Sequence, residues 1–520
     1  MNPNYIGNRM RTLLEGSAAR FRTTRTSTFA LAVLIYTLLR LPAFFEPHWY
    51  TDEAGYATAA REMLRGKLLY VEIWNNKPPL QLWTVAAGLR VFGSSEAGLH
   101  VITFVSGLVA LTARAYAAFS LLSERRGVVA VLVVSVVLGT PILDAELLIP
   151  ESLLIAPVTF AGALLLVGLN RPPRATDWRW AALIGVLAAL AVAYQQTALA
   201  DAAAFFLILL IHPRATQARR LAYAAAFAVT SVAWLVPSLM LAGPSKVVFA
   251  LAGFYVSYTA YGLPSDRLAA VAVAASMLLA ALLAFVSAVA LRARPLPWAA
   301  GLWSVATLLA AAAPQHPYPH LLLPAIVPTT LAVAGWIPAG EFRLAAGARV
   351  RLGVAAIAAA ALISVGLAQG TGVDWIPPSS SQPNLVGYYG GFAAVAAQNR
   401  SLDDWRDSFD VRVAPDAQVA AWLDESGLSQ ARAVVWSSDA WLYLLADLDE
   451  LMPTPPIYNN FVLLGSDGQV RAYVEDARPE IIVTDDLDTA SFPEILPLLL
   501  RDYTQVFSAG LEHVWVLNAA

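Results

Sequence analysis

The stretch YTDEAGYATAAREMLRGKLLYVEIWNNKPPLQLW, residues 50–83, lies between two long hydrophobic segments and is rich in ionisable and aromatic groups. After Thr51, a predicted N-cap, apolar side chains recur at helical spacing until Gly66 ends the pattern. This spacing predicts an amphipathic helix whose first turn carries Asp52 and Glu53. Helix N-termini favour ionised carboxylates, so we expect at least one of the two to be present as a base.

The turn NNKPP, residues 75–79, follows this helix. Its two prolines are stiff and suit the start of a second helix, which we expect to run to about Gly93. The turn carries one cation, Lys77. The loop of residues 46–96 therefore brings two carboxylates and one lysine between the first two hydrophobic segments.

The composition excludes an ordinary soluble globular protein. The chain has 520 residues, of which 58% are hydrophobic and 14% charged, and the apolar residues arrive in blocks of spanning length. It contains no cysteine, which excludes disulfides, thiolate catalysis and cysteine metal sites. The sequence predicts an α-helical polytopic membrane protein.

We predict about eleven membrane-spanning helices. A basic segment, residues 1–28, carries five arginines before the first apolar run and shows no convincing cleavage site, so the run is predicted to stay as the first span. The predicted spans are 29–45, 97–122, 127–143, 152–169, 180–195, 198–212, 221–242, 268–291, 297–313, 320–337 and 352–369. The block 180–212 is interrupted by polar residues, and broken helices at membrane depth usually line a cavity.

The loop charges predict the orientation. With the N-terminus inside, each cytoplasmic segment carries two to five arginines, whereas the short opposite loops 144–151, 196–197 and 314–319 carry none. We therefore expect a multi-pass protein of the cell (plasma or inner) membrane with a cytoplasmic N-terminus. The loop of residues 46–96 and the C-terminal part then lie on the outer face.

Residues 370–520 differ in charge from the rest of the chain. They hold 22 acidic residues and 7 arginines, a balance of −15, whereas residues 1–369 hold 27 basic and 15 acidic residues, a balance of +12. Short β-rich runs at Val434, Glu480 and His513 alternate with helical stretches at 415–425 and 466–477. This pattern predicts a soluble extracytoplasmic α/β domain of about three layers after a transmembrane domain of residues 29–369.

We expect no second catalytic site in this domain, because it contains no G-x-G-x-x-G motif, P-loop or metal-spaced histidine cluster. It is interpreted as a packing and acceptor-guiding cap over the outer mouth. The turn GYYGGF, residues 387–392 with Tyr388, fits an acceptor-side aromatic platform and a simple linker equally well.

The second outer loop, LDAELLIPESLL at residues 143–154, carries Asp144, Glu146 and Glu151 at the start of a predicted span. Each carboxylate alone suits a solvated helix cap. Together with the acidic pair of the first loop they favour a functional site, since ionisable groups at the membrane are usually functional.

The turn PQHPYPHLLLP, residues 314–324, carries His316, Tyr318 and His320. It is predicted to lie on the outer face of the membrane, as the two acidic loops do. A lone interfacial histidine is more often a hydrogen-bonding surface group. Two histidines and a tyrosine facing acidic loops favour a phosphate grip, or less strongly a divalent metal ion shared with Asp52 and Glu151.

DEAGYATAAREMLRGKLLY followed by NNKPPLQLW resembles the first outer loop of the GT-C superfamily of membrane glycosyltransferases, in the branch of protein O-mannosyltransferases and aminoarabinose transferases of lipid A. ELLIPESLL is similar to the second acidic motif of that branch, and YPHLLLPAIVP to its Y-P-H-Y turn. GYYGGF and VVWSSDAWLYLLADL resemble the tail domain of many members. The similarity covers most of the chain.

The resemblance implies a GT-C fold and a polyprenyl-phosphate sugar donor, with transfer on the outer face and inversion at the anomeric carbon. By position, Asp52 takes the place of the catalytic base and Glu53 its companion, with Lys77 as a phosphate-contacting cation and Glu151 as the second-loop carboxylate. Acid–base chemistry agrees, because a lipid phosphate leaves readily when a cation stabilises it, whereas an acceptor hydroxyl needs a base.

Two positions depart from the family pattern. Gln195-Gln196-Thr197 stands where many relatives have a lysine, and Gln315-His316 where relatives often carry arginine. The phosphate site is therefore expected to rely on Lys77, His316 and His320, with Gln195 beside them, or on a metal ion.

Two other functions fit parts of the sequence. A secondary transporter or lipid flippase also has about eleven spans and broken helices, but its charges usually lie near the midplane within repeats. A GT-C enzyme with a pyrophosphate-linked donor is the second alternative. The sequence leaves the sugar open and does not choose between a glycan, a lipid and a protein acceptor; nothing in it predicts nucleic-acid binding.

Overall fold

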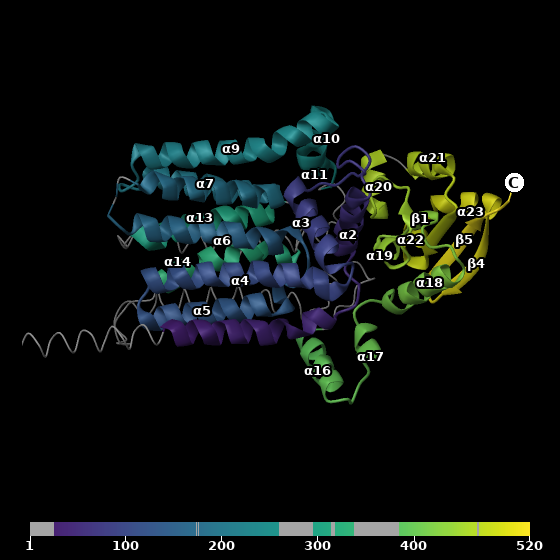
Figure 1. Ribbon diagram of the computed structural model, residues 1–520, viewed down its shortest axis with the longest axis horizontal. Helices are drawn as coiled ribbons and strands as arrows, with labels where there is room; N and C mark the ends of the chain where they lie inside the picture. Colours follow the sequence, from purple (N-terminus) through teal and green to yellow (C-terminus); the bar gives the residue numbers. More distant parts are fainter. Residues whose placement is uncertain are drawn as a thin grey trace, which may run out of the picture.

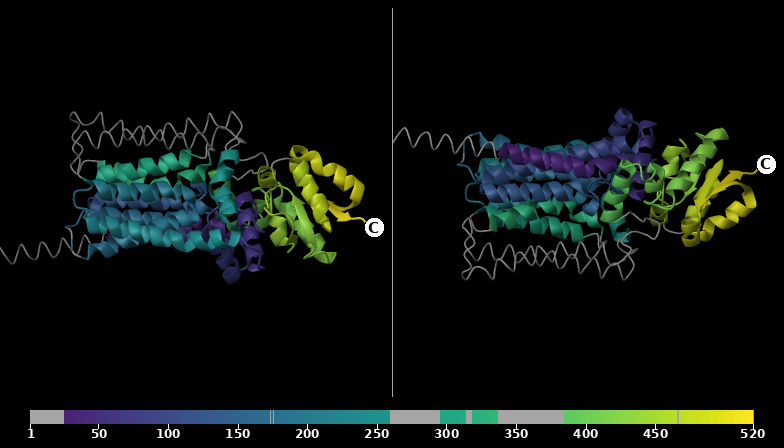
Figure 2. Two further views of the ribbon diagram at one scale, coloured as in Figure 1. Left: turned by 90° about the horizontal axis from the view of Figure 1, so that it is seen from above. Right: turned by 90° about the horizontal axis from the view of Figure 1, so that it is seen from below.

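The computed structural model describes the ranges 25–172, 176–258, 295–313, 318–336, 384–464 and 467–519, together with Arg174. Roughly parallel helices form a bundle at one end of the molecule and a mixed domain of helices and strands lies at the other, with α2 and α3 between them (Figure 1). The views from above and below show the same order along the long axis (Figure 2). The two outer-loop helices therefore lie between the bundle and the C-terminal domain.

Five helices are long and apolar enough to cross a membrane, so the chain is an integral membrane protein. Shorter apolar helices complete the described part of the bundle. Two predicted spans, 268–291 and 352–369, lie outside the described residues, so the total of about eleven stays a prediction. The long helices are Arg25–Phe45, which ends in η1 (Leu41–Phe45), α4 (Glu96–Leu121), α6 (Pro150–Leu169), α7 (Asp177–Tyr194) and α9 (Gln217–Ala242); the shorter ones are α5 (Glu124–Gly139), α8 (Leu199–Ile211), α13 (Pro295–Ala312) and α14 (Ile326–Trp336).

Small residues let the bundle helices approach one another closely. A Cβ atom at Gly162 of α6 would lie 2.2 Å from the Trp303 ring of α13. The Trp303 side chain is fully buried there and donates its indole N–H to Asp201. Close helix contacts at small residues replace the hydrophobic driving force that the bilayer does not provide.

The predicted break within residues 180–212 is confirmed. Helix α7 ends at Tyr194, Gln195 adopts an extended conformation, and the short η3 (Gln196–Ala198) leads into α8. The side-chain amide of Gln196 donates to the backbone carbonyls of Asn76 (3.1 Å) and Leu251 (3.2 Å). The break therefore connects the bundle to the lysine-bearing turn of the outer loop.

Helices α2 (Thr51–Leu64) and α3 (Pro79–Phe92) match the two helices predicted in the outer loop. Each is followed by a glycine at positive φ, Gly66 at 99° and Gly93 at 74°, a conformation that favours glycine. The predicted cap is wrong, because Thr51 is the first helical residue and Tyr50 occupies the N-cap position without a side-chain bond.

The expected amphipathic character of α2 is wrong as well. Nine of its fourteen residues are buried, and these include Glu53 and Glu62. A helix with one exposed face would leave such carboxylates in water. Helix α2 instead packs between the bundle and the C-terminal domain, with α19 (Trp441–Leu445) against it.

The C-terminal part contains a five-stranded sheet of order β2-β1-β3-β5-β4. Strand β1 is parallel to β2 and β3, whereas β5 is antiparallel to both β3 and β4. The strands predicted at Val434, Glu480 and His513 correspond to β1, β3 and β5. The strands are β1 (Arg432–Trp436), β2 (Asp449–Glu450), β3 (Ile481–Asp485), β4 (Tyr503–Ala509) and β5 (Glu512–Leu517).

Helices cover both faces of this sheet. Val435 and Val483 belong to a core shared with α18 and α19, whereas Val434 and Ile482, one residue earlier on the same strands, pack with α20, α21 and α23. The helical elements are α16 (Leu385–Ala396), α17 (Leu402–Arg406), α18 (Val413–Glu425), α20 (Ile457–Leu464), α21 (Asp467–Ala477), α22 (Asp486–Ser491), η6 (Pro493–Ile495) and α23 (Leu496–Asp502). Pro415 is the third residue of α18, not the first as predicted.

The GYYGGF segment forms part of helix α16, so its description as a turn is wrong. Tyr388 is buried and donates its phenolic O–H to Glu46 Oε1 at 2.5 Å, and Tyr389 donates to the Leu39 carbonyl at 3.0 Å. The side chains of this segment therefore attach α16 to the end of the first bundle helix.

Candidate active site

The candidate site lies where the bundle, the outer loop and the C-terminal domain meet. Asp52 opens α2 and is partly exposed, and Glu151 opens α6. Lys77 stands in the turn before α3. His320 lies in η5 (Pro319–Ala325), and the segment formed by α10 (Pro244–Val248), the π-helix η4 (Phe249–Gly253) and α11 (Phe254–Tyr258) completes the surroundings.

The environment of Asp52 combines burial with mixed charge. Desolvation raises the pKa of its carboxyl group, and the net shift is upward. The charges of Lys77 and His320 act in the opposite direction, whereas those of Glu151 and Glu53 add to the increase. Desolvation thus outweighs the helix-start effect that was expected to hold the carboxylate ionised, and it makes Asp52 a stronger base.

Lys77 is held by its backbone and its neighbours. Its carbonyl accepts from the Tyr70 hydroxyl at 2.6 Å, and its N–H donates to Asn75 Oδ1 at 3.0 Å. The Nζ atom donates to the Tyr255 hydroxyl at 3.3 Å and lies 5.9 Å from the centre of that ring. Within the described residues, no carboxylate oxygen lies within 4.0 Å of Nζ, so this cation has a neutral partner.

The pKa of Lys77 is nevertheless raised. Burial alone would lower it, but the neighbouring oxygens of Tyr255 and Glu151, followed by those of Asp52, outweigh that effect. The amine therefore stays protonated at neutral pH. Its positive charge in turn acts to lower the pKa of Asp52.

Other side chains of the site contact one another. Gln195 donates its side-chain amide to Glu151 Oε1 at 3.0 Å, and His320 Nδ1 lies 3.0 Å from Asp144 Oδ2. The Tyr318 ring stacks on His320 with centres 5.3 Å apart. Gln195 thus neutralises no phosphate charge by itself but orients the Glu151 carboxylate.

Glu53 and Glu146 do not join this group. Glu53 is fully buried, accepts from the backbone N–H of Leu148 and lies 3.4 Å from His100 Nε2. Glu146 lies 3.7 Å from Arg40 of the first bundle helix, and burial raises its pKa to about 8. His316, also predicted at the site, lies outside the described residues.

Several tyrosines near the site were not predicted as site residues from the sequence. Burial raises the pKa of Tyr50, Tyr56 and Tyr458, and the charge of Asp52 is the next largest cause for each. Tyr458 comes from α20 of the C-terminal domain. The run FYVSY at residues 254–258, which supplies Tyr255, was the available signal in the sequence, because aromatic residues gather there in an outer loop.

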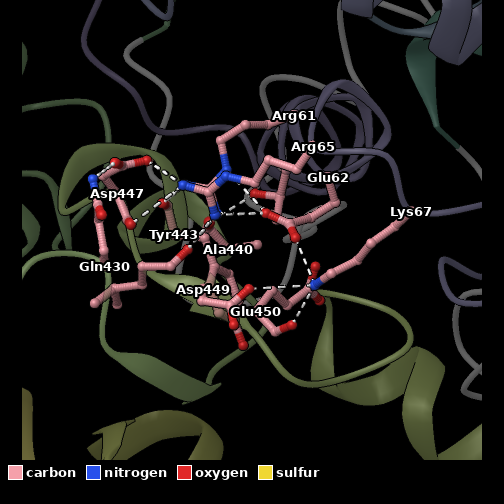
Figure 3. A network of polar contacts seen from close by, with 12 residues as sticks. Arg61, Glu62, Arg65, Lys67, Gln430, Ala440, Tyr443, Asp447, Asp449 and Glu450 are labelled. Atoms are coloured by element: carbon pink, nitrogen blue, oxygen red, sulfur yellow. Dashed lines mark hydrogen bonds and ion pairs between the residues drawn. The ribbon is translucent and has the colours of Figure 1, made fainter.

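The C-terminal domain contacts α2 through a network of hydrogen bonds and ion pairs (Figure 3). Arg61 donates to the carbonyls of Tyr443 and Leu448 and to Glu62, which is fully buried. Arg65 Nη2 pairs with Asp447 Oδ1 at 2.5 Å. Charge-assisted bonds of this kind are among the stronger polar contacts in proteins.

Further contacts join the C-terminal domain to other residues of α2 and to the segment that follows it. Lys67 Nζ donates to the Glu450 carbonyl at 2.7 Å, and the Thr58 hydroxyl donates to the Ala440 carbonyl at 3.2 Å. The backbone N–H of Trp74 donates to the Pro453 carbonyl at 2.6 Å. The domain therefore contacts the helix that carries Asp52 and also the segment that leads to Lys77.

Comparison with known proteins identifies the architecture. Residues 76–240 match the family model described as dolichyl-phosphate-mannose-protein mannosyltransferase, a range that includes Lys77 and Glu151 but begins after Asp52. The crystal structure of ArnT from Cupriavidus metallidurans, bound to undecaprenyl phosphate, superposes with a TM-score of 0.59 over 95% of this chain and 98% of that chain, at 16% identity. The chain therefore has the fold of the ArnT crystal structure, and its residues 76–240 resemble the dolichyl-phosphate-mannose-protein mannosyltransferases.

Two further proteins show more distant or shorter similarity to this chain. The apo oligosaccharyltransferase of Archaeoglobus fulgidus aligns over 89% of this chain and 69% of that chain, with a TM-score of 0.50 and 14% identity. An uncharacterized protein of Aquifex aeolicus (strain VF5) is 32% identical over 65 residues. That match spans 12% of this chain and 13% of the Aquifex protein.

Proposed function

We propose that the protein is an inverting glycosyltransferase that moves a sugar from a polyprenyl-phosphate donor to an acceptor hydroxyl. Asp52 acts as the general base, and Lys77 with His320 contacts the donor phosphate. The observation that carries the proposal is the position of Lys77. It is a protonated amine with a neutral hydrogen-bond partner, close enough to Asp52 for each to shift the pKa of the other.

Lys77 is a half-buried cation without a carboxylate partner among the described residues, and such a cation suits an anionic ligand. Desolvation makes such a charge costly, and a phosphate oxygen would relieve that cost with a charge-assisted bond. ArnT was solved with undecaprenyl phosphate bound, which supports a lipid phosphate as the ligand here. The sugar and the acceptor class, whether glycan, lipid or protein, stay open.

The reaction balances with these groups alone. The acceptor oxygen attacks the anomeric carbon while its proton passes to an Asp52 carboxylate oxygen. The bond between the anomeric carbon and the phosphate oxygen breaks, and the polyprenyl phosphate leaves with the electron pair. Lys77 and His320 stabilise the negative charge that develops on the leaving phosphate. Attack opposite the leaving group inverts the anomeric centre.

The second-loop residues position this machinery. Glu151 holds the Gln195 amide at the helix break, and Asp144 orients the His320 ring. Because Asp144 Oδ2 lies at Nδ1, we assign the phosphate contact to the other ring nitrogen of His320. The supporting shell thus comes from α6, η5 and the discontinuity after α7.

We propose that transfer occurs on the outer face of the cell membrane, with residues 370–520 as an extracytoplasmic cap. The arginine distribution among the loops supports this orientation. In the cap, the charge of Asp52 adds to the rise in the pKa of Tyr458 that burial causes, so the domain reaches the surroundings of the base and is suited to guide the acceptor hydroxyl. The metal set Asp52, Glu151 and His320 stays a prediction.

The test is transfer by the purified protein. A polyprenyl-phosphate sugar and an extract of envelope acceptors should yield a glycosylated product with inverted configuration. A product formed from a pyrophosphate-linked donor only would favour the second GT-C alternative. Movement of the donor across vesicles without transfer would favour a flippase, which the GT-C architecture does not suggest.

A further inference from the structure

We propose that Glu53, Glu96 and His100 form a binding site for a divalent metal ion of the Zn²⁺ class. The three residues come from the first turn of α2 and the first two turns of α4. All are buried, with at most 6% of each side chain accessible. This site lies apart from the Lys77 and His320 groups that contact the phosphate in the proposed function, and it does not depend on that function.

The spacing of the ligand atoms suits a shared metal ion. His100 Nε2 lies 3.4 Å from Glu53 Oε1 and 3.3 Å from Glu96 Oε1. Charge-assisted hydrogen bonds are shorter, about 2.7–2.9 Å. Two ligands bound at about 2.0–2.2 Å to one tetrahedral centre lie about 3.3–3.6 Å apart. All three residues offer ligand atoms within 4.8 Å of one another.

Orphaned polar atoms give a second, independent observation. Glu53 Oε2, both carboxylate oxygens of Glu96 and His100 Nε2 make no hydrogen bond within the described part of the chain. A buried carboxylate or imidazole nitrogen without a hydrogen bond is costly. Coordination would satisfy these atoms together, because carboxylate oxygen and imidazole nitrogen are both zinc ligands.

The atoms around the site orient the ligands. His100 Nδ1 lies 2.5 Å from the Ala43 carbonyl, so the proton of the neutral ring sits on Nδ1 and the lone pair of Nε2 points at the carboxylates. The Leu148 N–H donates to Glu53 Oε1, the same oxygen that lies near His100 Nε2, and this bond leaves Glu53 Oε2 without a hydrogen bond. His48 Nε2 lies 3.4 Å from Glu96 Oε2 and within hydrogen-bond distance of the Ser94 carbonyl, behind the ligands.

The ion would fix the position of Asp52 without contacting the reacting atoms. It would join the residue next to Asp52 to the start of α4, and through Ala43 to the end of the first bundle helix. Three protein ligands leave one position for water. We therefore assign the site a positioning role for the first turn of α2.

The experiment uses the full chain in detergent. After treatment with a chelator, we expect the protein to take up about one equivalent of Zn²⁺, and Co²⁺ to give the visible absorption band of a tetrahedral site. Glu96→Gln and His100→Gln should each weaken metal binding at least tenfold. Asp144→Asn, which alters a different carboxylate–histidine pair, should bind the metal as the unaltered chain does.

Two results would overturn the site. One is an unaltered chain that binds neither Zn²⁺ nor Co²⁺, which would mean that a protonated His100 sits between the two carboxylates instead. The other is unchanged binding in the double variant Glu96→Gln/His100→Gln. The cobalt spectrum of the unaltered chain decides the question even if a variant does not fold, and neither readout depends on sugar transfer.

Discussion

Asp52 and Glu53 are adjacent in sequence, yet their carboxylates serve different parts of the molecule. The charge on Asp52 is balanced by Lys77 and His320, whereas Glu53 is fully buried against the Leu148 N–H and His100. Neighbouring residues on a helix point about 100° apart. One helical turn therefore supplies both the base of the proposed reaction and the anchor that holds the helix.

The charge of Lys77 should dominate donor binding. Gln195 is engaged with Glu151, so it offers no second cation for the phosphate. We expect Lys77→Met to weaken binding of a polyprenyl-phosphate sugar by roughly 1.5–3 kcal/mol, or about 10- to 150-fold. Titration of the purified chain with the donor lipid measures this change. Arg90→Met, at an exposed position on α3, is the matched control, and equal affinities in the two variants would refute the assignment.

The environment of Gln195 changes a simple expectation about that position. A lysine introduced there would meet the Glu151 carboxylate at ion-pair distance. Gln195→Lys should therefore strengthen donor binding much less than a free cation would, by under tenfold. A larger gain would show that the new amine reaches the phosphate directly.

The polar contacts between the C-terminal domain and α2 should stabilise the folded protein. Arg61→Met removes the bonds to the Tyr443 and Leu448 carbonyls, and we expect a loss of roughly 1.5–3 kcal/mol. Thermal unfolding in detergent and the rate of protease release of the domain measure this loss. A variant with wild-type unfolding and release rate would show that the contacts in Figure 3 do not hold the domain.

The C-terminal domain should lose stability as the pH rises. Burial raises the pKa of Glu512 to about 8 from an ordinary value near 4.5, and burial also raises the pKa of Asp410 and Asp488 to about 6. A raised folded-state pKa gives stability that is fully present below the unfolded value and lost as the pH rises through the folded value. For Glu512 that window runs from about pH 4.5 to about 8.

Unfolding measured between pH 6 and 8.5 tests this expectation. One such group accounts for at most about 1.4 kcal/mol per pH unit. Glu512→Gln should flatten the upper part of the profile, while Glu425→Gln, at an exposed position, should leave it unchanged. Equal slopes in both variants would remove Glu512 from the explanation.

Local patterns in the sequence predicted the outer-loop helices and their glycine stops, because these depend on nearby residues. The break at Gln195 was visible for the same reason. The packing partners of these helices in the C-terminal domain could not be predicted. Thr58 meets Ala440 across 382 positions, and periodicity reports that a face is buried without reporting what covers it. The burial of Glu62 and the placement of Tyr458 beside Asp52 depend on that long-range docking.

The acidic domain should be accessible from outside the cell. Protease added to intact spheroplasts should release an acidic fragment that begins between residues 370 and 384. The arginine-rich loops predict this orientation. A fragment that stays protected until the membrane is opened would place the domain, and with it the Asp52 site, on the cytoplasmic face.

The central claim is that Asp52 takes the proton from the acceptor hydroxyl. Asp52→Asn keeps the size of the side chain but removes its basicity, and a positioned base contributes roughly 10²- to 10⁴-fold in rate. Because its pKa is raised, the rate of the unaltered protein should fall on acidification through a pKa above the ordinary aspartate value of about 4.

The most direct measurement is single-turnover transfer from a bound polyprenyl-phosphate sugar by the Asp52→Asn and Glu151→Gln variants. We expect Asp52→Asn to bind the donor with unchanged or higher affinity while its transfer rate drops by about 10²- to 10⁴-fold and loses its acidic limb. Glu151→Gln should be less severely affected. Near-normal transfer by Asp52→Asn, with Glu151→Gln inactive, would contradict the account and move the base to Glu151.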